Sequence, residues 1–269
     1  NGNASVRTGS AGAGSGTIDL EAFTGSIVQS ATSLIVSTSA QAQARLMAAQ
    51  NVTVGDIELA AGKVSITAVA GSVLDADALV TSGSTTVNDS DQDITAASVR
   101  IDAGTAVGAS VNHLETTAGT LTARAAGGGL WLLEADNVTV GDVTATVNRV
   151  LSDGSVTLAT TAPSTVTDAI QSDLRTTGAN GSIVLRSTAG DMLLTDGTAG
   201  VTSGASVSAH GSGNVLLQAL GASGNVQIDS DVVAASGNLS VIAKGSVTFG
   251  AAGDLMTASG AAGSGSIDV

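Results

Sequence analysis

The stretch GSIVLRSTAGDMLLTDG, from Gly181 to Gly197, contains the pattern that decides the fold. Apolar residues stand at alternate positions after Gly181, and a second segment headed by Gly190 repeats the pattern. An apolar period of two indicates a short strand with one buried face and one wet face. Glycine and aspartate between such strands are typical of corners, where the backbone takes a positive φ or needs a short capping side chain. The stretch therefore predicts two short strands joined by a bend.

Related units recur along most of the chain, and they begin at Gly16, Gly62, Gly119, Gly181, Gly213 and Gly237. The phrase NVTVGD also occurs twice, at residues 51–56 and 137–142. Most corners read Gly-Asn or Gly-Ser rather than the Asn-Gly or Asp-Gly of tight hairpins, so the chain bends at them instead of reversing. Short strands with repeated aliphatic layers are typical of coils that stack about 4.8 Å apart. We predict an all-β fold, a parallel β-helix (β-solenoid) with short Gly/Asn/Asp corners.

The spacing between units is irregular, so insertions must interrupt the coils. Two segments lack the strand pattern and favour helix by composition: AQAQARLMAAQ at residues 40–50 and VTDAIQSDLRTTGANG at 166–181. We predict a loop or short-helix insertion on the outside of the solenoid at each. Residues 1–269 are interpreted as a single β-solenoid. Because residues 12–20 resemble residues 260–269, we expect a segment or repeat unit of a longer chain or filament.

The composition restricts both the core and the partners. Hydrophobic residues make up 43% of the chain but aromatic residues only 1%, so the core must consist of thin layers of Val, Ile, Leu and Ala. A net charge of −14 repels nucleic acid and anionic lipid, and no apolar run is long enough to cross a membrane. We therefore expect neither nucleic-acid binding nor membrane insertion.

The sequence offers little for catalysis. His113 and His210 stand in polar contexts without a Ser or Cys nucleophile pattern, and we interpret both as surface residues. No catalytic or cofactor-binding residue is assigned, and no enzyme activity is expected. One alternative is a β-helical polysaccharide-degrading enzyme, although a chain with one Trp and no Tyr lacks aromatic platforms for sugar. The other is an ice-binding solenoid, because Thr-x-Thr triplets begin at Thr120, Thr144 and Thr165.

The sequence VNDSDQDI at residues 87–94 is the sharpest cluster of ligand-type residues. It places Asp89, Asp91 and Asp93 at alternate positions, as in the first half of an EF-hand loop, and their hard oxygens suit Ca²⁺. The match ends there, because Ile94 replaces the required glycine. We predict a calcium site at these three aspartates, with a solvated acidic corner as the alternative. Calcium would stiffen the solenoid and is not a required cofactor.

The glycine-headed units and the NVTVGD phrases, together with the absence of cysteine, resemble the β-helical repeat regions of large bacterial surface proteins, the filamentous-haemagglutinin and haemolysin-like adhesins. The resemblance covers most of the chain. It implies a secreted structural or adhesive protein that forms an elongated rod or filament at the cell surface. The expected partners are further coils of the same chain or copies stacked head to tail, together with a host-cell or matrix ligand.

Overall fold

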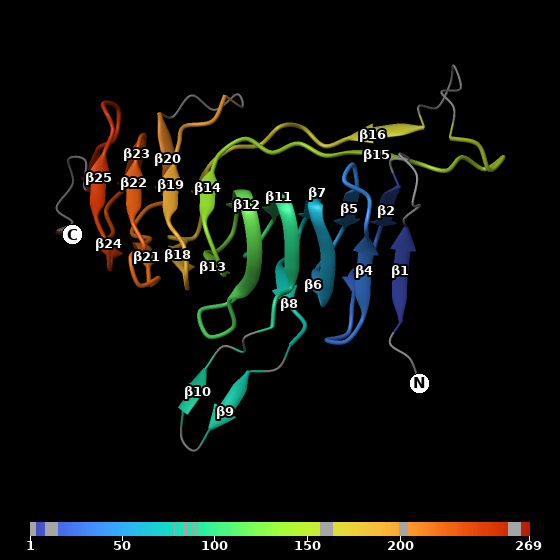
Figure 1. Cartoon of the computed structure of the whole chain (residues 1–269), viewed down its shortest axis with the longest axis horizontal. Helices are drawn as coiled ribbons and strands as arrows, with labels where there is room; N and C mark the ends of the chain where they lie inside the picture. The colour runs from blue at the N-terminus through green and yellow to red at the C-terminus, as the bar shows by residue number, and fades with distance from the viewer. Residues whose placement is uncertain are drawn as a thin grey trace.

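The computed structural model describes residues 4–8, 16–77, 79–82, 85–87, 89, 91–156, 164–198, 204–257 and 265–269. This part of the chain contains strands and turns and no helix, so no helix in it has the length and apolar character of a membrane span. The strands lie side by side along one long axis, and the two chain ends lie at opposite ends of that axis (Figure 1). Nearly all pairing is parallel and joins each coil to the next, which confirms the predicted parallel β-solenoid.

The strands stack in columns that we name face 1, face 2 and face 3. Face 1 consists of β1 (Ser5–Thr8), β4 (Leu34–Ser37), the first parts of β7 (Asp56–Ala68), β11 (Ile94–Ala103) and β12 (Leu114–Ala125), β13 (Leu130–Glu134), β18 (Ile183–Ser187), β21 (Val215–Ala219), β24 (Leu239–Ala243) and β27 (Ile267–Asp268).

Face 2 begins with β2 (Thr17–Ala22), β5 (Gln43–Ala48) and the second parts of β7, β11 and β12, and it then divides into two columns. One column contains β14 (Val138–Val140), β19 (Met192–Leu194), β22 (Val226–Ile228) and β25 (Val247–Phe249), and the other contains β17 (Leu174–Thr176), β20 (Ala205–Ala209), β23 (Asp231–Ala234) and β26 (Leu255–Thr257). Face 3 is short and consists of β3 (Ile27–Val28), β6 (Val52–Val54) and β8 (Val73–Asp75).

The core is a set of aliphatic ladders that run along the axis. On face 1, Leu132, Leu185, Leu217 and Val241 stack in register and are all buried. A fully buried side chain of this size stabilises the fold by roughly 1.5–3 kcal/mol relative to an exposed one. Each coil therefore adds its share of stability only when the next coil covers it.

The glycine at the head of each late unit lies where successive coils come closest. A Cβ added at Gly181, Gly213 or Gly237 would overlap the backbone oxygen of the glycine one coil earlier. Only a residue without a side chain fits in such a column. This steric requirement explains why the units in the sequence begin with glycine.

An asparagine beside several of the corners joins one coil to the next. Asn51 Oδ1 accepts a hydrogen bond from the backbone N–H of Ser72 (2.8 Å), and Asn137 Oδ1 accepts one from the N–H of Asp191 (2.8 Å). The two valines that follow each of these asparagines are buried. The NVTVGD phrase therefore recurs because both copies solve the same corner problem, on face 3 and on face 2.

The predicted insertion at residues 40–50 is wrong. Residues 43–48 form β5, a core strand whose Ala44, Leu46 and Ala48 are fully buried between the parallel neighbours β2 and β7. Alanine and glutamine favour helix in isolation, but parallel pairing on both sides overrides that preference.

The prediction at residues 166–181 is right in part. The described chain has no helix there; residues up to 171 lie outside the coils as predicted, but Leu174 is buried in the core strand β17.

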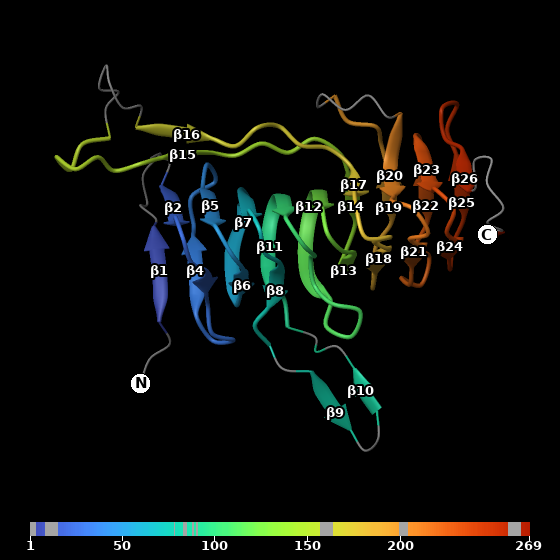
Figure 2. The same ribbon diagram turned by 180° about the vertical axis from the view of Figure 1, so that it is seen from behind.

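Two excursions leave the coils. The first, between β8 and β11, carries an antiparallel hairpin of β9 (Val80–Ser82) and β10 (Thr85–Val87), which hangs from the body of the solenoid in Figure 1. The second, residues 143–156 and 164–171, is named here the strap. Its strands β15 (Thr146–Asn148) and β16 (Thr165–Thr167) pair antiparallel. Figure 2 shows the strap running along the axis, back toward the N-terminal end.

Candidate functional site

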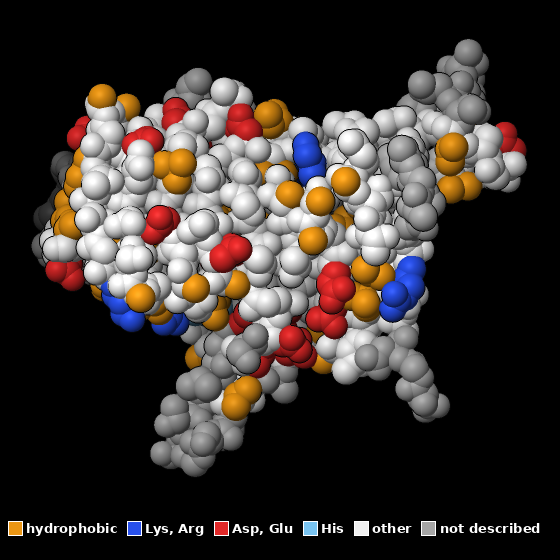
Figure 3. All heavy atoms as spheres, in the orientation of Figure 1, with side chains coloured by type: hydrophobic (Ala, Val, Ile, Leu, Met, Phe, Trp, Pro, Cys, Tyr) orange, Lys and Arg blue, Asp and Glu red, His pale blue; other side chains and the backbone are white. Residues whose placement is uncertain are grey.

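Three carboxylates from separate coils meet at the root of the β9–β10 hairpin. Asp75 ends β8, Asp93 immediately precedes β11, and Glu115 is the second residue of β12. One oxygen from each of the three lies within 4.8 Å of the others. We name these residues the acidic triad. Figure 3 shows acidic side chains gathered where the hairpin leaves the solenoid body.

The triad is largely buried. Asp93 is 2% exposed and Glu115 is 0% exposed. Asp93 Oδ2 accepts a hydrogen bond from the backbone N–H of Glu115 at 2.7 Å, which links the start of one coil to the next. Asp75 accepts hydrogen bonds from the N–H of Asp77 (2.6 Å) and from Nδ2 of Asn112 (2.6 Å).

Several oxygens at this place have no donor. Both carboxylate oxygens of Glu115 and Oδ1 of Asp93 are buried and lack a well-directed N–H or hydroxyl donor among the described residues, and the side-chain partner of each group is the other carboxyl group. Oδ2 of Asp89 and Oδ1 of Asn112 also lack such a donor. A buried oxygen without a donor loses its hydration without compensation, which costs about 1–3 kcal/mol and more when it is charged. The triad therefore needs either protons or a cation.

The electrostatics agree with this view. Burial, followed by the charge of Asp75, raises the pKa of Asp93, and burial also raises the pKa of Glu115. The pKa of Asp77 is raised to about 6 by its burial and by its neighbour Asp75. The ion pairs of the described chain use Arg45, Arg100, Arg124 and Arg149, and none of these pairs includes a triad residue.

The structure brings together only part of the predicted calcium site. Asp93 belongs to the triad, and the charge of Asp89 acts on Asp75 and Glu115. Asp91 is exposed, and its backbone N–H donates to Asp89 Oδ1 at 3.1 Å. Sequence reasoning missed Glu115, because its side chain points away from the core and is buried only through the fold around it. The weak signal for Asp75 was its acidic context in the sequence DAD.

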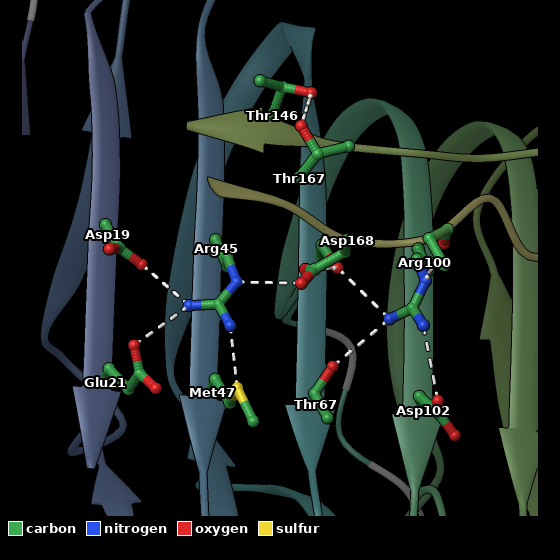
Figure 4. A network of polar contacts seen from close by, with 12 residues as sticks. Asp19, Glu21, Arg45, Met47, Thr67, Arg100, Asp102, Thr146, Thr167 and Asp168 are labelled. Carbon is green, nitrogen blue, oxygen red and sulfur yellow. Dashed lines mark hydrogen bonds and ion pairs between the residues drawn. The ribbon is translucent and has the colours of Figure 1, made fainter. Parts of the chain in front are cut away.

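A second polar cluster lies under the strap. Asp19, Arg45, Ser65, Arg100 and Thr122 occupy matching register positions on successive strands of face 2. Their side chains point outward from the core, yet Arg45, Ser65, Arg100 and Thr122 are buried. The strap covers this row, as the close view in Figure 4 shows for its two arginines.

The strap is held to the row by ion pairs and hydrogen bonds. Asp168 accepts from Arg45 Nε at 2.8 Å and from Ser65 Oγ at 2.6 Å. Arg149, on the other arm, pairs with Asp19 at 2.7 Å and also contacts Glu21. Ion pairs from Asp19, Glu21 and Arg45 on face 2 therefore fix the strap.

The remaining sequence candidates occupy different environments. His113 is buried, and its burial together with Arg186 lowers its pKa, so the interpretation as a surface residue is wrong for His113. His210 is exposed as predicted. Thr120 lies on β12, whereas Thr146 and Thr167 face each other within the strap at 2.9 Å. The Thr-x-Thr triplets thus do not line up on one face.

Both ends of the solenoid present open strand edges. In the described chain, β1, β2 and β3 pair only with the coil that follows, and β25, β26 and β27 only with the coil before. Apolar side chains are exposed at these ends, and they include Val6, Phe23 and Val28 at one end and Phe249, Met256 and Ile267 at the other.

Comparison of the chain with protein-family models, with curated proteins and with solved structures found no match. Function is therefore inferred from the fold and from these sites alone.

Proposed function

We propose that this chain is a structural element of an extracellular rod or filament at a bacterial surface, in which coils stack end to end. The observation that supports this role is the aliphatic core that runs along the axis and meets, within the described residues, an unpaired strand edge at each end. Unpaired edges act as templates for further strands. A second coil on either edge would extend every ladder of the core.

The N-terminal edge illustrates what a further coil would cover. A hollow at this end is lined by Ile35, which belongs to the buried core, and by the partly buried Leu20 and Ile27, which pack against that core. Val28 on β3 is exposed beside it. At the other end, Ile267 on β27 is also exposed. Because the two edges differ, contact between them is head to tail, and because the edges lie at opposite ends of the long axis, stacking along that axis yields an open filament.

A structural role also fits the use of charge. The network of ion pairs around Arg45 and Asp168 joins the strap to face 2. It is a buried fastening between parts of the same chain. We propose that the net charge of −14 keeps such rods apart laterally while the apolar ends associate.

Electron microscopy of the purified chain tests this proposal. We expect elongated particles that join end to end, and fibre diffraction with an axial repeat of about 4.8 Å. The variants V28K and I267K place a charge on either edge and should shorten the assemblies, because lysine blocks edge pairing. The control V69K introduces the same charge at an exposed corner in the body of the solenoid and should leave their length unchanged.

Assemblies that respond to all three variants alike would show that general charge and not the coil edges controls association. Compact particles without a long axis, or depolymerisation of acidic polysaccharides by the purified chain, would contradict the structural role.

A further inference from the structure

We propose that Asp75, Asp93 and Glu115 bind a divalent cation of the calcium class at the root of the β9–β10 hairpin. The site differs from the one expected from the sequence, because two of its three ligands come from outside the VNDSDQDI segment. It is also independent of the rod proposal, since it concerns one place within a single chain.

The geometry of the triad suits such an ion. Calcium takes oxygen ligands at 2.3–2.6 Å, so two ligands on opposite sides of the ion lie about 4.8 Å apart. One oxygen from each triad residue lies within 4.8 Å of the other two. Calcium takes 6–8 oxygens, and unpartnered Oδ2 of Asp89 and Oδ1 of Asn112 are further oxygens of the kind it accepts.

A neighbouring glutamate shows that the unpartnered state of Glu115 needs an explanation. Glu134 is also 0% exposed, but its oxygens accept hydrogen bonds from Thr116 Oγ1 (2.7 Å) and from the N–H of Ala118 (2.9 Å). At Glu134 the fold thus supplies hydrogen-bond donors that satisfy the buried carboxyl group without any ion. Glu115 has no such donor among the described residues; its side-chain partner is the carboxyl group of Asp93, and an oxygen of Asp75 lies close to both.

The position of the triad gives the ion a role. Asp75 and Asp93 stand at the two ends of the excursion that carries the hairpin, and Glu115 belongs to the next coil. A cation held by all three would close the base of the hairpin and fasten it to the solenoid. Without the cation, the carboxyl groups must take up protons or repel one another, and the junction loses the bridge between the coils.

The test is a calcium titration of the chelator-treated full chain by calorimetry and by thermal denaturation. We expect one saturable site with a Kd on the order of 10⁻⁴–10⁻³ M, and a melting temperature that rises with calcium concentration. In E115Q the melting temperature without calcium should equal or exceed that of the unmodified chain, because one buried carboxyl group that can ionise is replaced by a neutral amide. Calcium affinity should fall at least about tenfold in E115Q and in D93N.

The control D254N removes an exposed carboxylate on a distant coil and should bind calcium as the unmodified chain does. Because E115Q is expected to fold at least as well as the unmodified chain, its loss of binding cannot be attributed to misfolding. Two outcomes would overturn the proposal: no saturable binding of CaCl₂ up to 10 mM, a concentration about ten times the weakest expected Kd, or an equal calcium response in E115Q. The first result would mean that protons neutralise the triad, and the second that calcium binds elsewhere on the chain.

Discussion

Replacing Arg45 by methionine should detach the strap and destabilise the chain more than any change at the partly exposed Arg149. The Arg45 side chain is 6% exposed and contacts Asp19 and Asp168, which are themselves nearly buried. Removing the arginine leaves the carboxylate of Asp168 buried without its ion-pair partner, while Asp19 keeps only its pair with Arg149. Loss of one partner from a buried pair costs about 3–5 kcal/mol.

The change R149M provides the matched comparison. The Arg149 side chain is 35% exposed and pairs with Asp19 and Glu21 at the edge of the solenoid. Water and salt screen such a pair, and its loss costs about 0–1 kcal/mol. The structure therefore predicts a difference of roughly 3 kcal/mol between two arginines that hold the same strap.

Urea denaturation followed by circular dichroism measures both free energies of unfolding. Hydrogen exchange gives a local measurement, because the N–H of Asn148 donates to Thr17 Oγ1 at 2.8 Å only while the strap is seated. Its protection should fall sharply in R45M. The double variant R45M/D168N should be more stable than the sum of the single changes implies, by about 0.5–3 kcal/mol. A cost below about 1 kcal/mol for R45M, or an equal cost for R149M, would refute the idea that the buried charges fasten the strap.

Three further predictions concern the coils. Gly213→Ala should lower the melting temperature, because the added Cβ would overlap the backbone of Gly181 and such overpacking costs about 1–3 kcal/mol. In the same thermal assay Gly25→Ala should raise the stability by about 0.4–1 kcal/mol, because no atom lies within 4 Å of the added Cβ. Burial raises the pKa of Glu134 from 4.5 to about 8. The free energy of unfolding should therefore be highest below pH 4.5, where the group is protonated in both states, and should fall as the pH rises to about 8. Urea titrations at several pH values should show a smaller fall in E134Q. Leu217→Ala should cost about 2–5 kcal/mol by urea denaturation, and a cost below 1 kcal/mol would argue against a packed ladder.

The parts of the fold that depend on local pattern could be predicted from the sequence. Alternating apolar residues and glycine corners indicated parallel coils. The buried face of each strand requires an apolar residue at every second position, and the close approach of successive backbones at the corners requires glycine. The strand at Gln43–Ala48 escaped detection, because alanine carries little pattern and the partners on either side are distant in sequence. Gly62 and Gly119 were interpreted as unit starts, yet each lies inside one continuous strand that crosses from face 1 to face 2.

The candidate site shows the same limit. Asp93 was identified because its acidic neighbours are adjacent in the chain. Glu115 joins it only because stacking brings the next coil alongside, and Asp75 only because the hairpin excursion returns to its starting point. The strap was equally hidden, since nothing near Asp168 indicates that its partner is Arg45 on a coil far earlier in the sequence.

The strap also determines how the molecule responds to tension along its axis. A coil that is joined only to its neighbours can be pulled away from the end of the solenoid one coil at a time, because its hydrogen bonds reach only the adjacent coil. At the N-terminal end the outermost coil cannot peel until the contact of Asp19 with Arg149 breaks, and the next coil is held through Arg45 and Asp168. The coils from β18 to β27 have no such fastener among the described residues. In a pulling experiment, the first coil at the N-terminal end should therefore rupture at a high force. The coils from β18 to β27 should give a series of low rupture forces, one for each coil.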